Sequence, residues 1–181
     1  MSEFITLPPD ATPSELGPSE ALLQQAHAMA QTVKDHYLVY CDGACQGNGA
    51  RRATPGGWGV LVLHDGRVVL GRGGQRNTTN NQMELWGAIA ALRHIPAHAS
   101  VVLRTDSQYV VKGCTEWRQS WERNGMVNSK KEPVANAELW EQLWLEADRR
   151  QVKFEWVRGH NGDVGNEIAD QLATTEVKQM R

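Results

Sequence analysis

The sequence predicts an α/β fold with a mixed five-stranded sheet, three strands antiparallel and two parallel, flanked by helices. Three observations predict it. Five short apolar runs, rich in β-branched residues, occur between residues 37 and 157. Asp65-Gly66 separates the second run from the third at the spacing of a tight hairpin. Helical patterns precede the fourth and fifth runs, which favours parallel pairing through right-handed crossovers.

The expected elements follow one another from residue 37 onward. The helix at 80–95 places Leu85, Ile89 and Leu92 on one face, and Pro96 ends it. Because helices bury one stripe against a sheet, we expect the helices to flank it. Strands are expected at 37–41, 58–63, 68–72, 101–105 and 152–157, and further helices at 108–112, 137–149 and 164–180.

The first 36 residues differ from the rest, so two units are expected: an N-terminal arm, 1–36, and a main domain, 37–181. Four of the seven prolines lie before residue 19, so residues 1–18 are expected to be flexible. Ser19 then caps a helix over 19–35. Its apolar stripe would be Leu22, Ala26, Met29 and Val33. Docking on the main domain and binding to a partner both remain open for this helix.

Bulk composition excludes a strongly basic nucleic-acid binder. The 181 residues carry a formal net charge of -2, so any nucleic-acid surface must be a local basic patch. Three cysteines and a start without an apolar segment favour a reducing compartment. We therefore expect a soluble, cytoplasmic protein with no membrane association, and a monomer. Cys41 and Cys45 lie too far from His94 and His98 in the sequence for a zinc finger.

Two aspartates follow buried strands, which is chemically unusual. Asp42 ends the strand at 37–41, and Asp106 ends the strand at 101–105. If these strands are adjacent and parallel, both carboxylates lie at one edge of the sheet, where a hard divalent cation would relieve their repulsion. Glu84 lies in the first turn of a helix and Asp170 on the last helix. Taken alone, Glu84 also fits a helix-dipole acid and Asp170 a solvated one.

Four segments together closely resemble ribonuclease H type 1, the bacterial cellular form. They lie in the order of that family and on the expected elements, and the resemblance covers roughly residues 37–175. Each segment alone would be weak. The segments are Cys-Asp-Gly-Ala-Cys at 41–45, Thr-Thr-Asn-Asn-Gln-Met-Glu-Leu at 78–85, Thr-Asp-Ser-Gln-Tyr at 105–109, and Trp-Val-Arg-Gly-His at 156–160 running on to Asn-Glu-Ile-Ala-Asp at 166–170.

The resemblance implies an endonuclease that cuts the RNA strand of RNA–DNA hybrids by a two-metal-ion mechanism. Two Mg²⁺ ions, for which Mn²⁺ can substitute, would be held by Asp42, Glu84, Asp106 and Asp170, with Asp42 shared between them. His160, in a loop flanked by glycines, would shuttle protons and assist product release. The products would carry 5′-phosphate and 3′-hydroxyl ends.

The resemblance also implies contacts to both strands of the hybrid. Cys45, Asn48, Asn80 and Gln108 match positions near the 2′-hydroxyls of the RNA, which distinguish RNA from DNA. Asn81 resembles a contact to the DNA strand, and Thr79 matches a residue that binds a DNA phosphate. Asn80 and Asn81 also suit helix capping.

Residues 115–134, here called the handle, resemble the family's basic protrusion, which binds the DNA strand. Trp117 and Trp121 are spaced for packing together or against sugars. Three acids dilute the handle's positive charge, so we expect weak basicity, low hybrid affinity and a shallow salt dependence. The positive charges are Lys112, Arg118, Arg123, Lys130 and Lys131, and the acids are Glu116, Glu122 and Glu132.

The loop after the first strand departs from the family pattern. It is a few residues longer and contains Arg51-Arg52, for which extra phosphate contacts and a solvated loop both remain open. The insertion weakens the assignment of Asn48 most.

Other functions share parts of this pattern. A transposase or resolvase of the same fold also places acids on the first and fourth strands, but Glu84 on the helix between them favours ribonuclease H. A non-catalytic hybrid-binding module would normally lack one of the acids. A domain of a reverse transcriptase would explain the proline-rich start as a connector. Fold alone does not decide among these, because function resides in the site.

Overall fold

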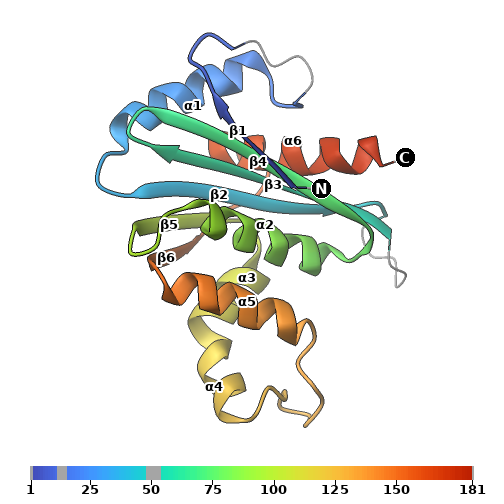
Figure 1. Ribbon diagram of the computed structural model, residues 1–181. Helices are drawn as coiled ribbons and strands as arrows, with labels where there is room; N and C mark the ends of the chain where they lie inside the picture. The colour runs from blue at the N-terminus through green and yellow to red at the C-terminus, as the bar shows by residue number, and fades with distance from the viewer. Residues whose placement is uncertain (1, 12–15, 48–53, 181) are drawn as a thin grey trace.

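The computed structural model describes residues 2–11, 16–47 and 54–180 (Figure 1). None of the helices in these ranges is long and apolar enough to cross a lipid bilayer. The strands are β1 (Ser2–Leu7), β2 (Tyr37–Cys45), β3 (Thr54–His64), β4 (Arg67–Thr78), β5 (Ser100–Thr105) and β6 (Gln151–Trp156). The helices are α1 (Glu20–Thr32), α2 (Asn80–His94), α3 (Gln108–Lys112), the π-helix Gly113–Trp117, α4 (Arg118–Arg123), α5 (Ala137–Asp148) and α6 (Val164–Gln179).

One mixed sheet organises the molecule, in the order β1-β4-β3-β2-β5-β6. The strands β2, β3 and β4 are antiparallel neighbours, whereas β5 runs parallel to β2 and β6 parallel to β5. The predicted hairpin between β3 and β4 is confirmed, since Asp65 and Gly66 both have positive φ, 45° and 76°, as its tight turn requires. The predicted fold class is therefore confirmed.

The expectation that residues 1–18 form a flexible arm is wrong for its beginning, and the sheet has a sixth strand. Residues 2–7 form β1, which pairs antiparallel with β4 from Ser2 opposite Gly73 to Leu7 opposite Val68. The prolines that suggested an arm all follow Leu7. The strand β1 pairs what would otherwise be a free edge of β4, and its Phe4 and Leu7 pack against the core.

The helix predicted over 19–35 is confirmed as α1, with Ser19 accepting a hydrogen bond from the backbone N–H of Leu22 as its N-cap. It packs against β3, β4 and α6, so docking on the main domain is confirmed. Its buried face differs from the predicted stripe in two of four positions. Leu23 and Ala30 are buried beside Ala26 and Val33, whereas Leu22 and Met29 lie at the margin. Two overlapping stripes satisfy the helical period, and only tertiary packing selects one.

Two hydrophobic cores lie on opposite faces of the sheet (Figure 1). The helices α2 and α5 cover one face, and α1 and α6 cover the other. The approach of α6 depends on missing side chains, because a Cβ at Gly59 of β3 would overlap the backbone carbonyl of Ala169. Since Gly59 pairs with Asp42 of β2, this contact places α6 directly beside the predicted acid.

Candidate active site

Three of the predicted acids converge at one point. Tyr40 of β2 pairs with Arg104 of β5, so Asp42 and Asp106, each two residues further on, lie side by side at one edge of the sheet. The expectation that Asp42 ends its strand is wrong, because β2 continues to Cys45 and Asp42 lies opposite Gly59 of β3. One carboxylate oxygen from each of Asp42, Asp106 and Glu84 lies within 4.8 Å of the others. The sequence argument from adjacent parallel strands is thus confirmed geometrically.

A glycine allows Glu84 to join the two aspartates. Glu84 is the fifth residue of α2, one turn later than predicted. A Cβ at Gly43 would lie 2.5 Å from the backbone nitrogen of Glu84, so only glycine lets β2 approach this part of α2 so closely. The backbone N–H of Gly43 also donates to Oδ1 of Asp42 at 2.8 Å. A capping box formed by Thr79 and Gln82 fixes the start of α2. Glu84 is therefore held by rigid elements on both sides.

The cluster is electrostatically uncompensated. Asp42 and Glu84 are each 5% exposed. Burial, followed by the charges of Asp106 and Asp170, raises the pKa of Asp42 to about 8. Burial and the charges of Asp42 and Asp106 raise the pKa of Glu84 well above its usual range. Among the described residues, Oε2 of Glu84 has no hydrogen-bond partner. Carboxylate oxygens that are close together and buried, and that have lone pairs free for coordination, suit Mg²⁺ or Mn²⁺.

Asp170 and His160 line the same groove from a different side of the sheet. Asp170 comes from α6 and lies outside the three-acid cluster, but it is near enough to raise the pKa of Asp42. His160 is exposed and has a positive φ of 52°. Its neighbour Gly159 packs so closely on the Asp106 carboxylate that a Cβ there would overlap it. The five residues Asp42, Glu84, Asp106, His160 and Asp170 define what we call the carboxylate groove.

The predicted RNA contacts Cys45, Asn80 and Gln108 also line the carboxylate groove. The side-chain amide of Asn80 donates to Oε1 of Glu84 at 3.4 Å, so Asn80 links the rim to the acids. The N-cap of α2 is Thr79 and not Asn80 or Asn81, the two residues for which capping was left open. Asn81 is exposed beside the groove without lining it. The predicted residues Asn48, Arg51 and Arg52 lie outside the described residues.

The handle carries its tryptophans on the π-helix and α4, at the end of the molecule away from α1 (Figure 1). The rings of Trp117 and Trp121 are 5.3 Å apart, which confirms that they pack together. Trp121 also contacts Trp140 and Trp144 of α5, with ring centroids 5.6 and 6.3 Å away. The contacts with α5 therefore anchor the handle to the domain. Trp117 and Trp121 also line a separate cleft, outside the carboxylate groove.

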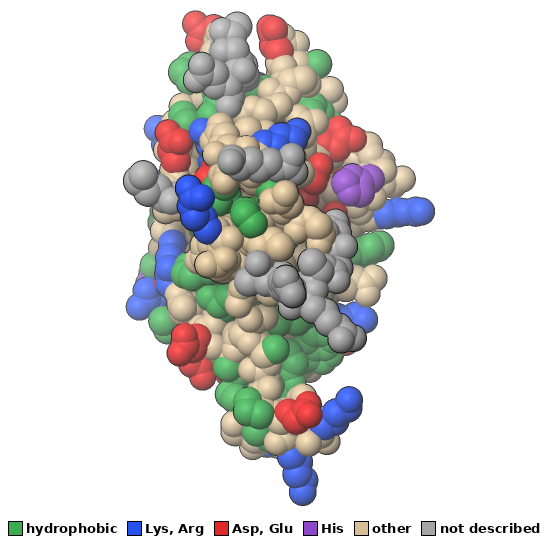
Figure 2. Space-filling view, turned by 90° about the vertical axis from the view of Figure 1, so that its right-hand side faces the viewer, with side chains coloured by type: hydrophobic (Ala, Val, Ile, Leu, Met, Phe, Trp, Pro, Cys, Tyr) green, Lys and Arg blue, Asp and Glu red, His purple; other side chains and the backbone are tan. Residues whose placement is uncertain are grey.

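The prediction that Arg118 adds free positive charge to the handle is wrong. Its guanidinium donates to both carboxylate oxygens of Asp148, at 2.6 and 2.7 Å, and also to Glu122. It lies over the ring of Trp144, 5.3 Å from the centroid. Figure 2 shows positive and negative side chains mixed at the lower end of the molecule, where the handle lies. Over the described ranges, no ion pair joins Lys112, Arg123, Lys130 or Lys131 to an acid.

Sequence reasoning missed a hydrogen-bond network that joins α2, α3 and α5. The side-chain amide of Gln82 donates to Oδ1 of Asn136 at 3.2 Å, and Asn136 donates to the hydroxyl of Tyr109 at 3.1 Å. Trp140 donates to the same hydroxyl. The network ties the start of α2 to the segment carrying Gln108. Its only sequence signal was an asparagine directly before a helix, a residue type that tolerates the left-handed φ of 60° found here.

Comparisons with known proteins agree with this geometry. A family model described as RNase H matches residues 34–178. A ribonuclease H from Pseudomonas putida (strain W619) is 48% identical over 149 residues, which cover 82% of this chain and 98% of the relative. A ribonuclease HI from Pseudomonas aeruginosa is 46% identical with the same coverage.

Solved structures show the same architecture. The crystal structure of LC9-RNase H1, described as a type 1 RNase H with the type 2 active-site motif, superposes with a TM-score of 0.72 at 34% identity. The match covers 82% of this chain and 74% of that one. The solution structure of the PFV RNase H domain, at 24% identity and a TM-score of 0.64, covers 80% of this chain and 96% of that domain and shares the fold.

Proposed function

The chain belongs to the ribonuclease H family, and from that premise we propose that it is an endonuclease that hydrolyses the RNA strand of RNA–DNA hybrids. The observation that carries the proposal is the convergence of Asp42, Glu84 and Asp106 in one groove, with Asp170 beside them. No acid of the family pattern is missing. This argues against a module that binds hybrids without cutting them.

Asp42, Glu84, Asp106 and Asp170 would hold two Mg²⁺ ions, with Asp42 shared and Mn²⁺ able to substitute. When bound, the ions supply an activated water and stabilise the negative charge that gathers on the reacting phosphate and the leaving oxygen. The buried, repelling carboxylates support this proposal, because nothing else among the described residues neutralises them. We propose products with 5′-phosphate and 3′-hydroxyl ends.

The protein's own groups would orient the RNA strand and move protons. His160 is exposed at the mouth of the carboxylate groove, on a loop bounded by Gly159 and Gly162, so it can reach a proton on the departing product. Cys45, Asn80 and Gln108 line the groove, and we propose that they contact the RNA strand there, where recognition of a 2′-hydroxyl would exclude DNA.

The DNA strand would lie toward the start of α2 and the handle. Thr79 and Asn81 are exposed at the start of α2, beside the groove. Trp117 and Trp121 line the handle's cleft, where sugars or bases of the strand would pack. Lys112, Arg123, Lys130 and Lys131 supply the charge that remains after Arg118 is paired. This smaller charge supports weak hybrid binding with a shallow salt dependence.

We also propose that residues 37–181 form the catalytic unit and that the protein acts as a cytoplasmic monomer. The family match begins at residue 34, after α1, which supports this boundary. A chain that starts at residue 34 should keep metal-dependent hybrid cleavage. Light scattering of the full chain should give the mass of one copy, and a stable dimer would contradict the proposal.

The function is tested by comparing cleavage of one sequence as RNA–DNA hybrid, double-stranded RNA, double-stranded DNA and single-stranded RNA, with Mg²⁺ or Mn²⁺. Only the RNA strand of the hybrid should be cut, and 5′-phosphate ends should appear in end-labelling. Chelation should stop the reaction. Equal cleavage of double-stranded DNA would reject the specificity, and cleavage unaffected by chelation would reject the metal mechanism.

A further inference from the structure

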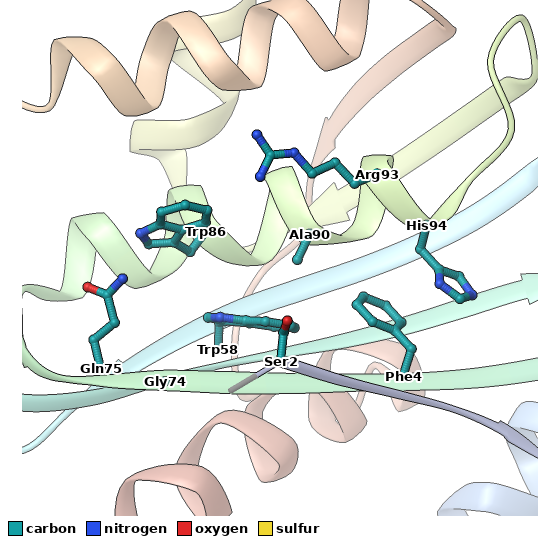
Figure 3. A pocket seen from close by; sticks show the side chains of 9 residues that line it. All are labelled: Ser2, Phe4, Trp58, Gly74, Gln75, Trp86, Ala90, Arg93 and His94. Carbon is teal, nitrogen blue, oxygen red and sulfur yellow. The ribbon is translucent and has the colours of Figure 1, made fainter.

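A second concave site lies on the other side of α2 from the carboxylate groove, and it shares no lining residue with it. Its volume is about 390 Å³, within the range of small-molecule sites. Figure 3 shows Trp86 and Ala90 of α2 above the ring of Trp58, with Gln75 at one end and Phe4 and His94 at the other. We call this site the aromatic slot.

Two glycines of β4 let aromatic rings of the slot lie close against this strand. A Cβ at Gly73 would lie 2.5 Å from the indole of Trp58, and one at Gly71 would overlap the ring of Phe4. Without those side chains, both rings lie against the strand, with centroids 6.0 Å apart and planes inclined at 37°. The ring of His94 stacks on Phe4 at 4.3 Å. Stacked aromatic surfaces favour a planar aromatic occupant.

The slot has two kinds of polar group. Arg93 is already engaged by Glu146 and Gln142, and burial lowers the pKa of His94, which favours its neutral form. In contrast, no side-chain hydrogen bond in the described part of the chain uses the Gln75 amide or the Trp86 indole N–H. The available groups are thus neutral: the Gln75 amide and the Ser2 hydroxyl, which both donate and accept, and the Trp86 N–H, which donates. A neutral heteroaromatic ring fits them better than a charged one.

We propose that the aromatic slot binds a purine base, adenine in particular, with its ring against the partly exposed Trp86 and the small part of Trp58 that stays accessible, and its polar edge toward Gln75. A glutamine amide pairs with adenine through two hydrogen bonds, one donated and one accepted. The Trp86 N–H supplies a donor for a further ring nitrogen. The base can belong to a free nucleoside or to an unpaired end of a nucleic-acid strand, since both present the same ring.

The slot is particular to the way the N-terminus folds in this chain. Phe4 and Ser2 come from β1, which precedes the segment matched by the family model. Without β1, the side of the slot opposite α2 would be open to solvent. Binding in the slot would therefore require β1 to be paired with β4, whereas no residue of β1 lines the carboxylate groove.

The test is a titration of the full ¹⁵N-labelled chain followed by NMR. Adenosine should shift the indole N–H signals of Trp58 and Trp86 and the side-chain amide of Gln75, saturating at about millimolar concentration, the affinity expected for one stacked and hydrogen-bonded base. Cytidine should bind at least about fivefold more weakly, because its single ring covers less of the aromatic surface. If single-stranded oligodeoxyadenylate saturates the slot at a lower concentration than adenosine does, the natural occupant is the end of a strand. If both saturate it at the same concentration, the occupant is a free nucleoside.

Two variants separate binding from folding. Gln75→Leu changes an exposed side chain and should weaken adenosine binding about fivefold or more while leaving thermal unfolding unchanged. Trp86→Ala should weaken it further. Leu145→Ala, which changes an exposed residue of α5 outside the slot, is the matched control and should bind as the parent does. The assay measures binding alone, so its result does not depend on hybrid cleavage.

Three results would overturn the proposal. One is the absence of saturable shifts up to roughly 10 mM adenosine, well above the expected affinity. Another is a set of shifts confined to residues of the carboxylate groove. The third is a Gln75→Leu protein that binds adenosine and cytidine as the parent does.

Discussion

The carboxylate groove and the handle treat charge in opposite ways. In the groove, Asp42 and Glu84 are buried beside Asp106 and are not neutralised by any described cationic side chain. In the handle, Arg118 is paired with Asp148 and Glu122 and covered by Trp144. In the groove, the repulsion between carboxylates destabilises the fold, and a bound cation can relieve it. In the handle, part of the positive charge is neutralised by ion pairs that stabilise the handle. Substitutions in the groove should therefore have large effects on hybrid cleavage, and substitutions in the handle should have small effects on hybrid binding.

The largest effect is expected from Asp42→Asn. Loss of the acid that contacts both proposed ion positions should lower the rate of hybrid cleavage by at least about 10³-fold, because metal-ion stabilisation contributes several kcal/mol to the barrier. Steady-state cleavage of a labelled hybrid in Mg²⁺ measures this. Leu145→Ala, far from the groove, should retain full activity. A fully active Asp42→Asn protein would contradict the proposed two-metal mechanism.

The same substitution should stabilise the metal-free protein at neutral and higher pH. The pKa of Asp42 is raised to about 8 in the fold, so the folded chain binds more protons than the unfolded one between about pH 4 and pH 8. Stability is highest below that window and is lost as pH rises through it. Asn has no charge to bury, so Asp42→Asn should gain a few kcal/mol at pH 8 and little at pH 4.

Urea denaturation in chelator at both pH values measures that gain. The difference between parent and variant isolates the acid cluster, because groups outside the cluster titrate alike in both, and loss of the Asp42 charge also removes one cause of the raised pKa of Glu84. Added Mg²⁺ should stabilise the parent at pH 8 more than the variant. A pH-independent difference would show that the cluster is not strained by its charge.

A smaller effect is expected from His160→Ala. Its exposed position at the mouth of the groove suits proton transfer and product release rather than metal binding. The turnover number should fall about tenfold to a hundredfold with little change in KM, since proton transfer contributes about that much or more. A rise in KM at unchanged turnover would instead assign His160 to substrate binding.

The smallest effects are expected in the handle, and they should separate two kinds of cation. Arg118→Ala should lower the free energy of unfolding by about 1 kcal/mol while leaving the salt dependence of hybrid binding nearly unchanged. The double substitution of Lys130 and Lys131 by Ala should do the reverse and reduce the salt slope by up to about two. Binding titrations at several salt concentrations distinguish them. A steep slope in the parent would contradict the weakly basic handle.

Two of the four acids were predictable from a local rule. Asp42 and Asp106 end apolar runs, and parallel pairing brings the ends of such runs together. The family segments added Glu84 and Asp170, which periodicity alone cannot distinguish from ordinary helix acids. Gly43 and Gly59, whose missing side chains let α2 and α6 approach β2 and β3, had no signal beyond being glycine.

The parts that were not predictable depend on contacts between distant residues. The strand β1 was not predicted because its partners in β4 lie 61 to 71 residues away in the sequence, from Leu7 with Val68 to Ser2 with Gly73. The prolines after β1 also suggest a flexible arm. The buried face of α1 uses Leu23 and Ala30 in place of Leu22 and Met29 for a similar reason. The pairing of Arg118 with Asp148 spans 30 residues and cancels a charge that composition counts as free.

The central claim is that the acids of the carboxylate groove hold the metal ions at which the RNA strand is cut. A crystal structure of the Asp42→Asn chain would miss the shared ligand, so the direct measurement uses the unaltered chain with Mn²⁺ and a hybrid whose RNA linkage resists hydrolysis. We expect anomalous density between Asp42, Glu84, Asp106 and Asp170, with an RNA phosphate beside it. Density elsewhere, or a DNA phosphate at that position, would contradict the central claim.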